Sequence, residues 1–249
     1  MNNSQKIGIT ESSEVSFNLD VFDRLYDGNI IITKRLTNNL IDKLIEHKDK
    51  IILHLTCTGY GNSVLEPFVP TMEVTRKKFG LLLEKGFPIE QCVLRIDPCI
   101  PTEEGLGKMC SVVKLFSDTG IKRVRFSVLD MYDHVKKRFN EKGLEIPFET
   151  FHAPLEIRKE MYDVLCELGM KYGFEVEACA EPGIESVPCL SQKDIDILGL
   201  TDKIRLVGSK EQRKNCSCPS NKQELIEGKD KAKRCKNSCL YCFWSDIKD

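Results

Sequence analysis

The chain has little of what marks an exported or membrane-embedded protein. No apolar run approaches the roughly 20 residues that a helix needs to cross a bilayer. The N-terminal stretch MNNSQKIGIT contains no apolar core of the kind found in signal peptides, so secretion is not expected. The sequence therefore predicts a cytoplasmic protein without a membrane partner, whose thiols stay reduced.

Two further absences bear on the fold. No G-x-G-x-x-G motif follows the first predicted strand, which argues against a dinucleotide-binding doubly wound sheet, and no internal repeat is visible. The chain of 249 residues is 41% hydrophobic and 30% charged, which is ordinary for a globular protein. It is long enough to bury a sizeable core.

Short apolar runs alternate with amphipathic helical patterns along most of the chain. The predicted strands are 6–10, 29–34, 50–57, 92–97, 123–130, 174–181 and 203–209. The predicted helices are 37–50, with a cap at Thr37 or Asn38, 71–85, 106–116 and 153–172, with a stop at Gly173. This alternation predicts an α/β fold, a closed or nearly closed (β/α) TIM-like barrel.

The composition changes near residue 208. Residues 1–208 form the predicted barrel domain, and residues 209–249 form a polar, lysine-rich extension that contains clustered cysteines. Residues 201–249 hold 12 Lys+Arg against 7 Asp+Glu, although the whole chain has a net charge of −1. The basic excess either attracts an anionic substrate or nucleic acid, or offsets the charge of thiolates in a metal site; we favour the second.

Polar residues end several of the predicted strands. In (β/α) barrels the chemistry lies at the C-terminal ends of the strands, so these residues are candidates for one shared pocket. Asp130 alone is also explained as a helix cap, and Arg95 with Asp97 as a structural ion pair. The candidate catalytic residues are Lys34, Tyr60, Arg95, Asp97, Asp130 and Glu181, with Ser127 as a candidate cofactor-binding residue.

Five of the 12 cysteines lie in the extension, within the segment 216–242. The stretch NCSCP supplies Cys216 and Cys218, and RCKNSCLYC supplies Cys235, Cys239 and Cys242. Polar residues surround them, so burial as small hydrophobic side chains does not explain them. Clustered thiols in a reducing compartment indicate a site for zinc or an iron–sulfur cluster.

The spacing distinguishes these two sites. Zinc prefers four tetrahedral ligands in two pairs, which leaves one of the five cysteines unexplained. The C-x3-C-x2-C spacing of Cys235, Cys239 and Cys242 suits three irons of a [4Fe–4S] cluster, with the fourth iron open to a small molecule. Cys216 and Cys218 are then supplementary ligands or a second, smaller metal site. If one of them fills the fourth position, the cluster is closed.

This spacing, with Tyr241 just before the third cysteine, resembles the radical S-adenosylmethionine signature. The resemblance implies that the open iron binds S-adenosylmethionine, which is then cleaved reductively to a 5′-deoxyadenosyl radical. It implies a reductase or ferredoxin as electron donor. Tyr241 would pack beside the cluster or the adenine, and Phe243 and Trp244 would shield the cluster. Arg213 is a candidate for binding a carboxylate or phosphate.

The chain also resembles an uncharacterised bacterial family of unknown function whose C-terminal cysteine cluster is similar to that signature. The resemblance rests on the stretches IITK (31–34), TGYGNSVLEPFVP (58–70), LRIDP (94–98), SVLDMY (127–132), ACAEP (178–182), KEQRKNCSC (210–218) and CKNSCLYC (235–242). It implies a barrel-like α/β fold and iron–sulfur ligation.

Three functions remain as hypotheses. The first is a radical enzyme that acts on a small-molecule or nucleotide substrate. The second is an electron-transfer or non-catalytic protein with a closed [4Fe–4S] cluster. The third is a zinc-stapled nucleic-acid-binding protein built on the basic extension, whose binding would weaken with salt. Few aromatic residues lie among its lysines, which argues against stacking on single strands.

Overall fold

The computed structural model describes residues 6–208, 215–226 and 235–244. Its centre is one sheet of seven strands in the order β6-β5-β4-β3-β2-β1-β7. Every neighbouring pair of strands is parallel. The strands are β1 (Ile7–Ile9), β2 (Asn29–Thr33), β3 (Ile51–Thr56), β4 (Cys92–Cys99), β5 (Arg123–Val128), β6 (Glu175–Ala178) and β7 (Lys222–Glu224).

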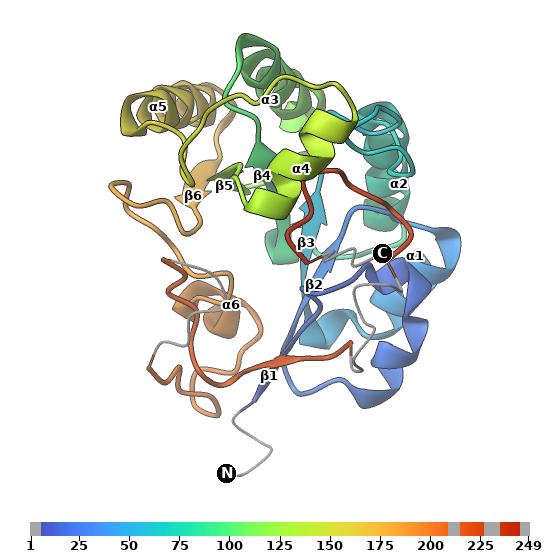
Figure 1. The fold of residues 1–249 in the computed structure, drawn as a ribbon. Coiled ribbons are helices and arrows are strands. Elements are labelled where there is room, and N and C mark those ends of the chain that lie inside the picture. Colours follow the sequence, from blue (N-terminus) through green and yellow to red (C-terminus); the bar gives the residue numbers. More distant parts are fainter. Residues whose placement is uncertain (1–5, 209–214, 227–234, 245–249) are drawn as a thin grey trace.

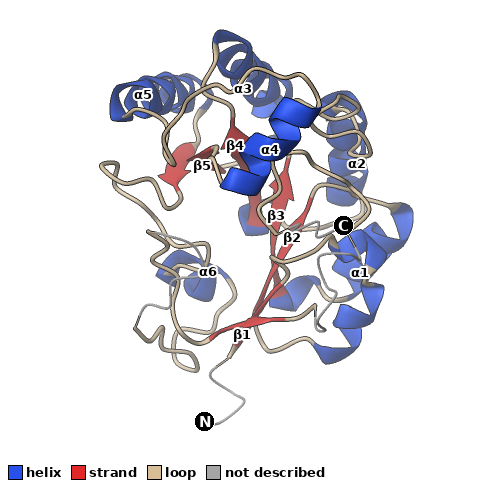
Figure 2. Cartoon of the chain, viewed as in Figure 1, coloured by secondary structure: helices blue, strands red, loops and turns tan. Residues whose placement is uncertain are grey.

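Helices follow most of the strands, and all the described α-helices except the last cover the outside of the curved sheet (Figures 1 and 2). They are α1 (Asn38–Glu46), α2 (Met72–Glu84), α3 (Glu103–Phe116), α4 (Asp133–Glu141), α5 (Leu155–Tyr172) and α6 (Gln192–Ile197). Short 3-10 helices lie at Val15–Phe17, Leu19–Arg24, Lys48–Lys50, Ile89–Gln91 and Ser117–Thr119.

Local sequence signals fix several helix ends. The side-chain oxygens of Thr37, Thr71 and Thr102 accept the backbone N–H of the residue three positions on, at the starts of α1, α2 and α3. Gly173 ends α5 with φ 77°, a left-handed conformation that favours glycine. The predicted cap at Thr37 and the predicted stop at Gly173 are therefore confirmed.

Alternate residues along the strands face two separate cores. One face packs against α1 to α5, and its strand residues include Ile31, Leu53, Leu55 and Leu94. The opposite, concave face carries Ile9, Ile30, Ile52 and Val93, which pack with Ile195 of α6. Burial on both faces explains why these strands read as continuous apolar runs.

The first six predicted strands are confirmed, but the seventh is wrong. Residues 203–208 form no strand, and Ile204 instead packs into the core of the concave face. The seventh strand is β7, which pairs with β1 through Lys222, Gln223 and Glu224. None of these three residues is apolar, so β7 has no periodicity that sequence reasoning could detect.

The sheet is not closed into a barrel by hydrogen bonds among the described residues, because β6 and β7 are its two edges. The described residues that follow β6, among them α6, lie on the open side of the sheet (Figure 1). The α/β class is therefore confirmed, whereas the hydrogen-bonded closure of a TIM-like barrel is not observed. No helix of the described residues is long and apolar enough to cross a membrane.

The concave face carries a buried ion-pair network near β5 and β6. Glu177 binds the Nε of Arg123 at 2.8 Å and also pairs with Arg125, and Asp194 binds Nη1 of Arg123 at 2.8 Å. These four side chains are at most 2% exposed. Burial by itself would raise the pKa of Glu177, but the charges of Arg125 and Arg123 outweigh it and lower that pKa below its usual value.

Replacing Glu177 by glutamine should lower the free energy of unfolding by about 3–5 kcal/mol, because two buried guanidinium groups lose a shared countercharge. The full difference in the free energy of unfolding should be observed at pH values above the ordinary glutamate pKa of about 4.3. It should shrink as pH falls further, because protonation of Glu177 removes the same charge in the wild type. Urea unfolding at several pH values measures both effects.

Glu175 is the matched control, because it lies on the same strand and pairs with Lys193 at the surface, where the two side chains are 57% and 45% exposed. Glu175→Gln should change the free energy of unfolding by less than about 1 kcal/mol. Equal losses for Glu175→Gln and Glu177→Gln would show that the buried network is not what stabilises this part of the sheet.

Candidate metal centre

The described cysteine loop, residues 235–244, lies over the C-terminal ends of β1, β2 and β3. The backbone N–H of Leu240 donates to the carbonyl of Leu65 at 2.9 Å. Asn237 donates to a carboxylate oxygen of Glu14 at 3.2 Å, and Arg138 of α4 donates to the carbonyl of Cys242 at 2.6 Å. Three separate segments of the α/β unit thus hold this loop in place.

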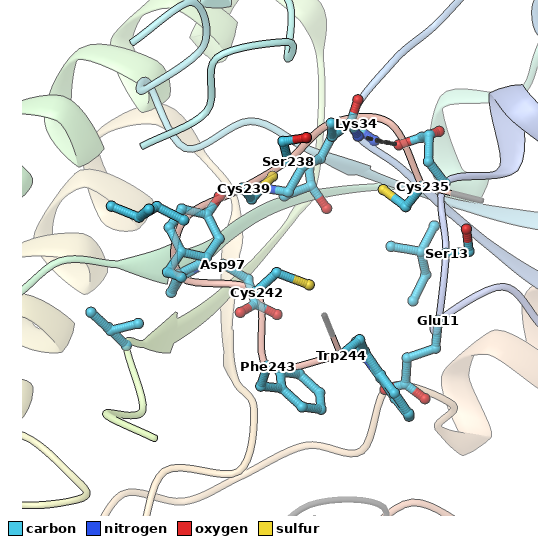
Figure 3. Close-up of a pocket in the computed structure, with 18 of the residues that line it drawn as sticks. Glu11, Ser13, Lys34, Asp97, Cys235, Ser238, Cys239, Cys242, Phe243 and Trp244 are labelled. Carbon is cyan, nitrogen blue, oxygen red and sulfur yellow. Dashed lines mark hydrogen bonds between the residues drawn. The ribbon is translucent and has the colours of Figure 1, made fainter. Parts of the chain in front are cut away.

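Cys235, Cys239 and Cys242 border one cavity of about 840 Å³. Their side chains surround the same open space in Figure 3. The loop turns tightly there, since Ser238 has φ 51° and the N–H of Cys242 donates to the carbonyl of Cys239 at 3.1 Å. Chain spacing and turn geometry together bring the three thiols to one side of the cavity.

Burial raises the pKa of Cys235, and it raises the pKa of Cys239 far above the usual value despite the opposing charge of Lys34. The charge of Cys242 also raises the pKa of both thiols, and that of Cys235 raises the pKa of Cys239, because neighbouring thiolates repel. A cation bound among them would reverse this effect, since it stabilises the deprotonated thiolates.

A buried hydrogen-bonded group anchors the loop beside Cys239. Glu66, which is 1% exposed, binds Lys34 at 2.9 Å, accepts a hydrogen bond from the hydroxyl of Tyr241 and accepts another from Thr58 at 2.8 Å. The Lys34 ammonium also lies 3.0 Å from the Tyr241 hydroxyl. Burial would lower the pKa of Lys34, but the charge and hydrogen bond of Glu66, together with the charges of Cys239 and Asp97, outweigh it and raise that pKa, so Lys34 stays protonated.

The other predicted pocket residues divide into two groups. Lys34, Arg95, Asp97 and Asp130 border the cavity, as does the predicted cofactor residue Tyr241. Arg95 pairs with Asp97, and Asp130 pairs with His152 at 2.8 Å rather than capping α4, whose N-cap is Tyr132. The expected ion pair is therefore present, and the expected helix cap is wrong.

The remaining candidates lie outside the cavity lining. Tyr60 and Ser127 are buried but do not border the cavity. The Glu181 carboxylate accepts the N–H of Val128 at 2.7 Å and binds Arg158 at 3.2 Å, contacts that fix the loop after β6. Arg213 lies outside the described residues.

Cys216 and Cys218 belong to a different group of thiols from the three in the loop. Cys216, Cys179 and Cys189 border the cavity, whereas Cys218 is fully buried and lies next to Cys189 and Cys216. Sequence reasoning did not assign Cys189 to any site, because it is separated from the other clustered cysteines along the chain.

Aromatic side chains form one wall of the cavity. Phe243 stacks on Tyr132 with ring centroids 5.6 Å apart, and Trp244 lies 4.9 Å from Phe243. Figure 3 shows Phe243 and Trp244 on the side of the open space opposite Lys34. Such a wall excludes water and offers faces for stacking.

The three loop thiols share one cavity. Within residues 6–208, 215–226 and 235–244, no three histidine, cysteine, aspartate or glutamate side chains form a group that could hold one metal ion. In a mononuclear zinc–thiolate site the sulfurs lie about 3.8 Å apart, from a Zn–S distance of about 2.3 Å and tetrahedral angles.

One protein family matches the chain, over residues 14–244, and its description is "Domain of unknown function (DUF1848)". No curated protein matches the sequence.

Removing the negative charge of Glu66 beneath the cysteine loop should expose Cys239. In metal-free protein, Glu66→Gln weakens charged hydrogen bonds worth about 1.5–3 kcal/mol each. If alkylation proceeds through local opening of the loop, its rate at Cys239 should rise about ten- to hundred-fold. Mass spectrometry of the alkylated peptide measures the rate. Glu73→Gln, at an exposed carboxylate on α2, is the control and should leave it unchanged; a folded Glu66→Gln variant with unaltered Cys239 reactivity would refute the anchoring role.

Proposed function

The chain belongs to the DUF1848 family, and we propose that it is an iron–sulfur enzyme of radical S-adenosylmethionine type. In this proposal Cys235, Cys239 and Cys242 each bind one iron of a [4Fe–4S] cluster, and the fourth iron holds S-adenosylmethionine. The observation that carries the proposal is the placement of all three thiols on one large cavity at the C-terminal ends of the strands.

The arrangement of the thiols fits a cluster better than a single ion. A [4Fe–4S] cluster gives each thiolate its own iron, so its ligating sulfurs do not have to be in contact. The three thiols share the cavity without forming a group that could hold one ion. The aromatic wall of Phe243 and Trp244 would keep water from the cluster, and exclusion of solvent is one of the factors that set its reduction potential.

A cluster held by Cys235, Cys239 and Cys242 would supply one-electron reduction of S-adenosylmethionine, with a reductase or ferredoxin as the source of the electron. The protein's own residues position the reactants. Arg95 and Lys34 supply positive charge at the cavity for a carboxylate, and Asp97 and Asp130 supply acceptors for hydroxyl or amine groups.

The size and lining of the cavity support a small-molecule or nucleotide substrate. Ligand pockets are typically about 300–1,000 Å³, and a cavity of about 840 Å³ lies in the upper part of that range. Both signs of charge border it, together with stacked aromatic rings. A substrate with a ring and polar substituents suits this lining better than a purely apolar one.

A closed cluster is the second candidate, because Cys216 borders the same cavity as the three loop thiols. With Cys216 on the fourth iron, the protein would transfer electrons without cleaving a cofactor. The EPR spectrum of the reduced cluster separates the two candidates: S-adenosylmethionine should change the spectrum if the fourth iron is open and leave it unchanged if Cys216 binds there.

Anaerobically reconstituted and reduced protein should release 5′-deoxyadenosine from S-adenosylmethionine, measured by liquid chromatography with mass spectrometry. Cys239→Ala should abolish release and lower the iron and sulfide content, because a cluster held by two thiolates is lost. Cys166→Ala removes a half-buried thiol of α5 and should preserve both. Full iron and sulfide content in the wild type without any 5′-deoxyadenosine would overturn the proposed enzyme.

A further inference from the structure

A second group of cysteines lies between the two unpaired edges of the sheet. Cys179 directly follows β6, and Cys189 precedes α6 in the next loop. Cys216 and Cys218 come shortly before β7. All four belong to the core of the concave face, where they pack with Ile195 and Ile204. The group therefore links the segment that leaves one edge strand to the segment that enters the other.

The sulfurs of this group are in contact with one another. The Sγ atoms of Cys179 and Cys189 are 3.5 Å apart. The thiol of Cys218 hydrogen-bonds to Cys189 and Cys216. Two sulfurs bound to one tetrahedral zinc ion lie about 3.8 Å apart. The Cys179–Cys189 distance is thus close to that of a mononuclear thiolate site.

Hydrogen-bond donors surround the sulfurs in the way that metal-bound thiolates require. The backbone N–H of Cys189 donates to the sulfur of Cys218 at 3.3 Å, and Nη1 of Arg95 lies 3.8 Å from the sulfur of Cys189. Outer-shell donors of this kind stabilise metal thiolates.

We propose that Cys179, Cys189, Cys216 and Cys218 bind a single thiophilic cation, Zn²⁺, separate from the site of the three loop cysteines. The four thiols are now joined in pairs by hydrogen bonds, and no three surround one point. Binding replaces the thiol protons, which leave to solvent, with bonds to the ion. The sulfurs then close around it, and the ion joins the ends of the sheet that hydrogen bonds leave open.

This inference does not rest on the proposed enzyme, because zinc is measured separately from iron, sulfide and 5′-deoxyadenosine. The first experiment uses the full-length variant Cys235→Ala/Cys239→Ala/Cys242→Ala, incubated with Zn²⁺ and desalted. Elemental analysis should find one zinc per chain with no acid-labile sulfide. Adding Cys189→Ala should lower the zinc content at least tenfold, whereas adding Cys166→Ala should leave it unchanged.

A second measurement covers the case in which the Cys189→Ala variant does not fold. In wild-type protein, Zn²⁺ should protect Cys179, Cys189, Cys216 and Cys218 from alkylation, as mapped by mass spectrometry, and should leave the half-buried Cys110 unprotected. Zinc should also raise the Tm, because it binds the folded chain. Absence of bound zinc, equal zinc loss in the Cys166→Ala control, or iron with sulfide at these four cysteines would each overturn the proposal.

Discussion

The pairing of β7 with β1 is the constraint on which the rest of the site depends. In a parallel sheet all strands end at the same edge, so a segment that follows any strand begins at that edge. The three-residue pairing of β7 with β1 returns the chain to the first strand. The cysteine loop then reaches the ends of β1 to β3, where Leu65 and Glu14 hold it. The contacts of the loop with Leu65 and Glu14, and that of Tyr241 with Glu66, then fix its position relative to Lys34.

The concave face shows how the protein accommodates charge in its interior. An ion removed from water is costly unless it is paired, and each buried cation here has a countercharge close by. Arg123 and Arg125 share Glu177, Arg95 pairs with Asp97, and Lys34 pairs with Glu66. The charged groups near β6 form a buried network, whereas Arg95, Asp97 and Lys34 border the cavity. The same pairing that keeps the interior stable therefore fixes the polar groups of the candidate site.

Sequence reasoning predicted the parts of the fold that have strong local signals. The first six strands have apolar runs, and the first predicted helix has a threonine cap at Thr37. It failed for β7, whose residues are polar and whose only support is an edge pairing distant in sequence. Similarly, the cysteine loop was visible from its spacing, whereas Cys189 joined Cys218 only through the fold. Glu66 and Glu14 were missed because single carboxylates carry no motif.

The neighbouring positions of β1 and β7 also have a consequence for chain order. The segments that contain β1 and β7 come from opposite ends of the sequence and lie side by side. The residues that surround the cysteine loop are therefore set by the fold and not by the position of the loop along the chain. A circular permutation that joined the ends and opened the chain elsewhere would leave the same side chains around the same cavity. Sequence searches that require a fixed order of motifs would treat two such proteins as unrelated, although their sites could be superimposed.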